Sequence, residues 1–264
     1  MITERTSQQA FLGTSVLLFA ASAGLTTAWC ESMSAMGEMT MPGGWTMSTA
    51  WMPMPGQTWL GTATSFVGMW VVMMVAMMLP SLVPTLWRYR QMIGNTGETR
   101  PSWLTALAAM GYFFVWTMCG VAVFPLGAAL VEIEMQQPAL ARVVPIAVGV
   151  VVVIAGTLQF TAWKAHHLAC CRGPSGRERT LPGDGGAAWR YGLRLAIHCT
   201  YGCAGLTAIL LVIGVMDLRV MTLVTAAITA ERLAPNGVRV ARAIGSVVVG
   251  AGLLFIVRAA AGLG

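Results

Sequence analysis

Charged residues are scarce in this chain. Only 10% of its 264 residues are Asp, Glu, Lys or Arg, whereas a soluble globular domain carries about 25%. Apolar residues make up 56%, and the mean hydropathy is +0.71. This composition excludes an ordinary soluble domain and indicates a protein of the lipid bilayer. No chain of carboxylates crosses the apolar runs, which argues against a proton-coupled pump.

Several sequence signatures are also missing. The chain has no P-loop, so ATP-driven transport by this chain alone is excluded. It has no basic stripe on a soluble face, so the net charge of +6 does not indicate nucleic-acid binding. It has no internal repeat of fixed period, and an inverted-repeat transporter fold gains no support. A Cys-x-x-Cys motif is absent, which argues against a membrane thiol oxidoreductase.

Long apolar runs predict transmembrane helices, because unpaired backbone groups are not tolerated in lipid. Seven runs qualify: 11–29, 60–86, 103–130, 143–163, 195–214, 218–233 and 243–262. The sixth is the weakest, since charged residues flank a short apolar stretch. We expect an all-α polytopic membrane protein with a single membrane domain, residues 1–264. It is a bundle of seven transmembrane helices, or six if 218–233 is re-entrant.

Basic residues set the expected orientation. Most of the 16 Lys and Arg residues fall in the N-terminus and in alternate loops. The positive-inside rule therefore places the N-terminus in the cytoplasm, in a bacterial inner membrane. Residues 30–58 then form an outer, periplasmic loop, and residues 164–192 form the longest inner loop.

The outer loop is rich in methionine. These residues lie among small, polar, Pro and Gly residues with no apolar face to bury, so core packing explains them poorly. Thioethers are soft, neutral ligands that select Cu(I). The candidate copper ligands here are Met33, Met36, Met39 and Met41. The alternative is an interfacial loop that inserts Met and Trp side chains among lipid head-groups.

The next apolar run contains MWVVMMVAMMLPS, residues 69–81, in which five residues are methionine. On a helix, Met69, Met73 and Met77 share one face because they are four residues apart, while Met78 lies on a second face. A ladder of thioethers could pass a soft cation inward. The alternative is that these flexible side chains only fill space in a packed helix.

A second cluster of candidate ligands lies on the inner side. All three histidines and four of the six cysteines fall within 38 residues. The candidates are His166, His167, Cys170, Cys171, His198, Cys199 and Cys203. Imidazole and thiolate together bind Cu(I), and zinc is the alternative metal at this Cys/His cluster. Buried structural cysteines, palmitoylated cysteines and a redox pair remain alternatives.

Four stretches together resemble a known family. They are MWVVMMVAMMLPS with its AMMLPS core, the KxxHLxxCRxP arrangement from Lys164 to Pro174, CTYGC at 199–203, and GVMDLRVM with Glu231 at the end of the following helix. The family is a bacterial family of predicted metal-binding integral membrane proteins, described as copper chaperones. The resemblance covers about residues 60 to 250.

The resemblance implies functional roles for Met69, Met73, Met77, Met78, Lys164, Cys171, Cys199 and Cys203. The chain departs from the family pattern at two places. His167 stands where the family has a cysteine before the leucine. CTYGC replaces a cluster that usually has adjacent cysteines and a tryptophan. Three histidines could compensate for the missing cysteines.

We therefore expect a membrane copper-handling protein. Methionines would capture Cu(I) and the Cys/His cluster would relay it, by delivery to a membrane cuproenzyme or by uptake. One alternative is an accessory subunit of a larger membrane complex, with a Met-rich packing surface. Another is a membrane thiol oxidoreductase. No catalytic arrangement is indicated beyond the clustered Cys and His residues, so an enzyme is the less favoured reading.

Overall fold

The computed structural model describes residues 2–35, 39–40, 46–47, 51–52, 56–94, 101–171 and 184–261. Its described residues are almost entirely helical, as expected for a polytopic membrane protein. The helices are α1 (Ile2–Ala35), α2 (Trp59–Gly94), α3 (Pro101–Gln136), α4 (Pro138–Ala141), α5 (Val144–Leu158), α6 (Ala162–Cys171), α7 (Gly185–Ile213), α8 (Leu218–Leu233) and α9 (Gly237–Ala260). Two short antiparallel strands, β1 (Met39–Thr40) and β2 (Thr46–Met47), lie between α1 and α2.

Five of these helices are long and apolar enough to cross a membrane, namely α1, α2, α3, α7 and α9. A sixth span results if α5 and α6 are taken together, although the pair is bent by 68°. The remaining predicted span, 218–233, coincides with α8. Its 16 residues rise only about 24 Å, less than the roughly 30 Å of a bilayer core. By length and composition alone, the helices that could cross a membrane therefore number five, or six with the bent pair, and α8 is not among them.

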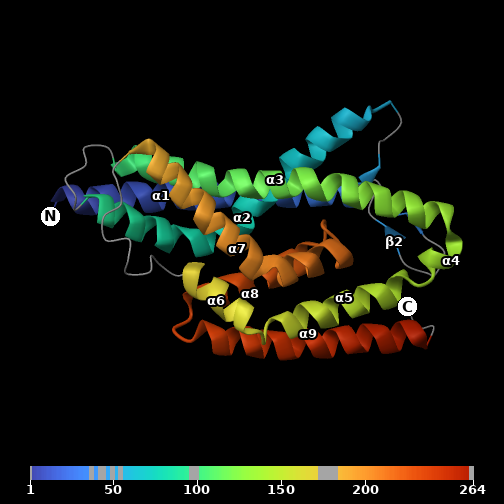
Figure 1. The fold of residues 1–264 in the computed structure, drawn as a ribbon. Helices are drawn as coiled ribbons and strands as arrows, with labels where there is room; N and C mark the ends of the chain where they lie inside the picture. Colours follow the sequence, from blue (N-terminus) through green and yellow to red (C-terminus); the bar gives the residue numbers. More distant parts are fainter. Residues whose placement is uncertain are drawn as a thin grey trace.

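Helix α2 is the centre of the bundle. It packs against α1, α3 and α8, while α3 packs on α7 and α5 packs on α9. Its most apolar window is 61% buried, compared with 11% for α1. Figure 1 shows α5 and α9 side by side along one edge, with α6, α7 and α8 meeting in the middle. The outer faces carry many exposed large apolar side chains, as the lipid-facing surface of a membrane protein requires.

The helices extend into both predicted loops. Helix α1 continues to Ala35 and α2 begins at Trp59, so the first part of the 30–58 segment is helical. Helix α6 continues to Cys171 and α7 begins at Gly185, which shortens the 164–192 segment to 172–184. Polar loop composition did not reveal these extensions, because helix ends at the membrane surface need no continuous apolar pattern.

The outer-loop methionines are only partly described. Met33 lies in α1 and is half-buried, while the backbone of Met39 lies in β1. Met36 and Met41 lie outside the described residues. The structure therefore leaves the predicted copper capture by this loop untested.

Candidate metal centre

Three cysteine side chains from two helices come together inside the bundle. Cys171 ends α6, while Cys199 and Cys203 lie one turn apart on the same face of α7. Each is at most 4% exposed, and the Sγ atoms of Cys199 and Cys203 are 3.8 Å apart. The hydroxyl of Tyr112 on α3 donates a hydrogen bond to the Cys199 Sγ over 2.9 Å. We call Cys171, Cys199 and Cys203 the thiol cluster.

A buried arginine faces the thiol cluster. Arg232, in the last turn of α8, is 9% exposed, and its guanidinium interacts electrostatically with all three thiols and with Tyr112. Its Nη1 donates a hydrogen bond to the Ser81 Oγ over 2.9 Å, and Ser81 donates to the Met78 carbonyl over 3.0 Å. Its Nη2 has no hydrogen-bond partner among the described residues. Arg232 thus connects the thiol cluster to the methionine-rich part of α2.

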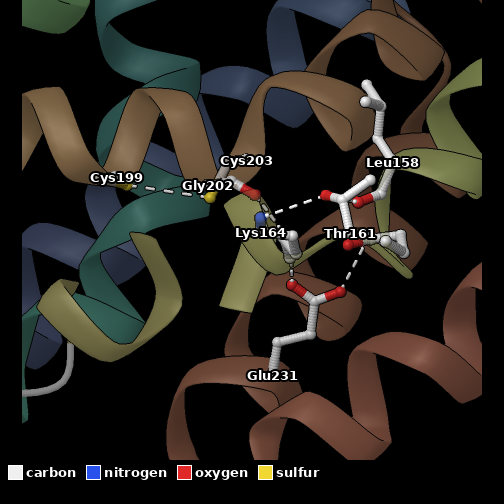
Figure 2. Close-up of polar contacts among 8 residues, drawn as sticks. Leu158, Thr161, Lys164, Cys199, Gly202, Cys203 and Glu231 are labelled. Carbon is white, nitrogen blue, oxygen red and sulfur yellow. Dashed lines mark hydrogen bonds and ion pairs between the residues drawn. The ribbon is translucent and has the colours of Figure 1, made fainter. Parts of the chain in front are cut away.

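A second buried network borders the thiol cluster. Lys164, the only lysine of the chain, donates hydrogen bonds over 2.6 Å both to the Glu231 carboxylate of α8 and to the Gly202 carbonyl of α7. The other Glu231 oxygen accepts from Gln159 Nε2 over 3.0 Å. Figure 2 shows Lys164 between these two acceptors, with the hydrogen-bonded pair Cys199 and Cys203 alongside. The ion pair fixes the bend between α5 and α6 against α7 and α8.

The predicted Cys/His cluster divides into two parts. The His167 and His198 Nδ1 atoms are 3.1 Å apart, and both rings are only partly buried. His166 is exposed, and its Nε2 is 3.8 Å from the Cys170 Sγ. The histidines and Cys170 therefore lie nearer the surface than the thiol cluster, and together they do not form one ligand shell.

Among the described residues, no group of three or more His, Cys, Asp or Glu side chains is arranged to hold a metal ion. A structural zinc site needs four such ligands, so the zinc alternative gains no support. A soft monovalent ion such as Cu(I) is satisfied by fewer sulfur ligands. Metal–sulfur bonds of about 2.3 Å allow one ion to join two sulfurs up to about 4.6 Å apart. The 3.8 Å between Cys199 and Cys203 meets that condition.

The five methionines between residues 69 and 78 are buried inside the bundle, on both faces of α2. Met69, Met73, Met74, Met77 and Met78 are between 0% and 6% exposed and belong to the same apolar core as the thiol cluster. Side chains buried within the chain cannot form a packing surface for another subunit. The burial therefore removes the main reason for treating these methionines as an accessory-subunit interface.

Sequence reasoning did not identify Tyr112, Ser81 or Arg232 as part of the site. Tyr112 lies 87 residues from Cys199 in the chain, and no local pattern links them. Arg232 lies beside Glu231 in an otherwise apolar segment, a placement that often marks function. A further sulfur pair was also missed, since the Cys30 and Met216 sulfurs are 3.9 Å apart.

The model of a family described as PpoB2, copper chaperone, matches residues 67–255. The matched range contains the α2 methionines, the thiol cluster and Arg232. No curated protein and no solved structure matches the chain.

Proposed function

Because the chain belongs to the PpoB2 copper chaperone family, we propose that it carries Cu(I) as cargo at the buried pair Cys199 and Cys203. The observation that supports this most directly is the 3.8 Å separation of their Sγ atoms in the apolar core. Thiolates are soft ligands that prefer Cu(I) to hard cations. Cys171, at the end of a neighbouring helix, offers a third thiol to which the ion can exchange.

The α2 methionines form the proposed path to this pair. Met69, Met73 and Met77 repeat every four residues, so their thioethers follow one another by about a turn. Thioethers need no deprotonation, so a cation can pass between them without proton transfer. Met78 lies closest in sequence to Ser81, which contacts Arg232 beside the thiols.

Capture and delivery occur at opposite ends of this path. Met33, Met36, Met39 and Met41 collect Cu(I) outside the bacterial inner membrane, where the positive-inside rule places residues 30–58. The ion then passes from the thiol cluster to a set of exposed or partly buried side chains near the opposite side, His166, His167, Cys170 and His198. From there the ion passes to a membrane cuproenzyme or into the cell.

The decisive experiment measures Cu(I) binding by the detergent-purified protein in competition with a chromogenic Cu(I) chelator, without oxygen. We expect about one tightly held copper ion, lost in Cys199→Ser and in Cys203→Ser. Cys170→Ser is the matched control, because this cysteine lies outside the thiol cluster, and it should keep the ion. Unchanged binding in both buried-cysteine variants would reject the proposed site.

The outer loop is tested separately. Replacing Met33, Met36, Met39 and Met41 with leucine removes the thioethers while keeping similar side-chain volume. Total copper stoichiometry should fall while the ion held by Cys199 and Cys203 remains. Unchanged stoichiometry would count against capture by this loop.

A further inference from the structure

Arg232 is a buried cation whose nearest carboxylate is already paired. Its neighbour Glu231 has one oxygen bound to Lys164 and the other to Gln159. Among the described residues, the Arg232 guanidinium donates a hydrogen bond to the neutral hydroxyl of Ser81, and the Cys171 thiol also lies within its hydrogen-bonding reach. Its Nη2 lacks a hydrogen-bond partner among the described residues and faces the same interior as the thiols.

Burying the Arg232 guanidinium among neutral groups destabilises the fold unless a further negative charge lies nearby. A guanidinium stays protonated in proteins, so Arg232 cannot lose its charge on burial as a lysine can. A buried charge needs a counter-ion or several charge-assisted hydrogen bonds. The groups that surround it, apart from Glu231, are three thiols and the phenol of Tyr112, which are neutral when protonated.

We propose that Arg232 is the counter-ion of an anionic metal–thiolate complex at Cys199 and Cys203, and that it restricts the site to monovalent soft cations. This inference rests on the proposed copper site. When one Cu(I) binds, it replaces the two thiol protons, which leave to the solvent. The bis-thiolate complex then carries one negative charge, and Arg232 balances it.

A divalent ion gives a different charge balance at the same pair. Two thiolates and Zn(II) or Cd(II) form a neutral complex, which leaves the guanidinium charge of Arg232 uncompensated and repels the bound ion. A third thiolate would restore the balance, but no three such ligands among the described residues are arranged to hold a metal. Arg232 therefore favours a monovalent ion over a divalent one through charge alone.

The test compares Ag(I), which has the charge and softness of Cu(I), with Cd(II). Affinities are measured for the wild-type protein and for Arg232→Gln in detergent. We expect Ag(I) to bind at least about tenfold more weakly in the variant, because a buried opposite charge is lost. Cd(II) affinity should stay constant or rise. Arg219→Gln, which removes an exposed arginine at the other end of α8, should change neither affinity.

A merely structural role for Arg232 predicts a different result. In that case Ag(I) and Cd(II) affinities fall together, and this outcome would overturn the inference, as would an unchanged Ag(I) affinity. If Arg232→Gln does not fold, Ser81→Ala provides the test instead. It removes the hydrogen bond from Arg232 to Ser81 but keeps the charge of Arg232. Ag(I) affinity should then stay within about threefold of wild type, and a tenfold loss would contradict a role for charge.

Failure of the inference and failure of the proposed site are distinguishable. If Cys199→Ser and Cys203→Ser retain Ag(I) and Cu(I), the proposed site is wrong. If those variants lose both ions while Arg232→Gln keeps them, the site stands and only the role of Arg232 is rejected.

Discussion

The Tyr112 hydroxyl and the Cys199 thiol form the closest polar contact of the proposed copper site, at 2.9 Å. Both groups are completely buried, so water cannot replace a lost partner. A hydroxyl donates a stronger hydrogen bond to a thiolate than to a thiol, because the acceptor is charged. In the proposed site, Tyr112 would therefore stabilise the metal-bound form of Cys199 more than the free thiol.

Tyr112→Phe removes this hydrogen bond and little else. The expected loss is about 1 kcal/mol, which corresponds to roughly fivefold weaker Cu(I) binding. Chelator competition measures the change. Tyr201→Phe is the control, since Tyr201 is an exposed tyrosine on α7, and its effect should be negligible. Equal effects of the two substitutions would show that the Tyr112 hydroxyl does not act on the site.

The thioethers of α2 can be separated from their packing role by leucine substitution. Met-to-Leu changes conserve volume and cost under about 1.5 kcal/mol each. Leucine at Met73, Met74, Met77 and Met78 should leave the protein folded but slow the loading of Cu(I) from the outer side of proteoliposomes. Leucine at the exposed residue Met110 is the matched control. Normal loading in the α2 variant would make these methionines packing residues only.

Among the helices, the contact between α3 and α7 positions Tyr112 against Cys199. The two helices approach closely at Gly111 and Gly192. A Cβ at Gly192 would overlap the Ala108 carbonyl, and one at Gly111 would lie 2.7 Å from the Trp189 carbonyl. Glycine at both positions lets the helix backbones come together, as small residues do in membrane bundles.

Gly192→Ala should therefore force α3 and α7 apart. We expect a lower melting temperature together with weaker Cu(I) binding, because the Tyr112 hydroxyl moves away from Cys199. Gly250→Ala is the control, since a Cβ there meets nothing within 4 Å. It should leave both properties unchanged or raise stability slightly, given the better helix propensity of alanine. Similar behaviour of the two variants would contradict the close-approach argument.

The ion pair between Lys164 and Glu231 fixes α6, α7 and α8 relative to one another. Lys164→Met leaves a buried carboxylate without its cation, at a cost of about 3–5 kcal/mol. The double variant Lys164→Met with Glu231→Leu should recover much of that loss, because both charges of this pair are then removed together. Thermal unfolding in detergent measures both. If the double variant loses as much stability as the two single variants together, Lys164 and Glu231 are not coupled.

At the scale of the whole molecule, the first and last helices run in the same direction. In Figure 1, both α1 and α9 begin toward the left of the view, and α9 ends at the right. If α1 begins inside, as the positive-inside rule predicts, this shared direction predicts that α9 ends outside. A six-span topology would instead place both ends inside.

Reporter fusions decide between these topologies. A fluorescent protein that folds only in the cytoplasm should fluoresce at the N-terminus and stay dark at the C-terminus. A periplasmic phosphatase should give the reverse pattern. Fluorescence at both ends would mean that α8 does not complete a crossing, as its length of 16 residues would allow.

The amino-acid sequence by itself determined the fold class and indicated a copper-handling role, which the family match supports. Long apolar runs must be helices in lipid, because every backbone group needs an internal partner. This rule predicted the helices, including α8, although α8 is not among those long and apolar enough to cross a membrane. The family resemblance drawn from local motifs is confirmed by the match over residues 67–255. Helix ends were less accurate, because polar turns at the surface carry no apolar period.

Only the tertiary structure decided which candidate ligands lie together. Spacing of four residues predicted that Cys199 and Cys203 share a face, and they do. The sequence could not show that the histidines lie away from the thiol cluster, since helix rotation depends on packing against other helices. Nor could it show that Tyr112 and Arg232 join the thiols, because these contacts connect residues far apart in the chain. The burial of α2 at the bundle centre likewise depends on its neighbours, because hydropathy is the same for a helix that faces lipid and one that faces protein.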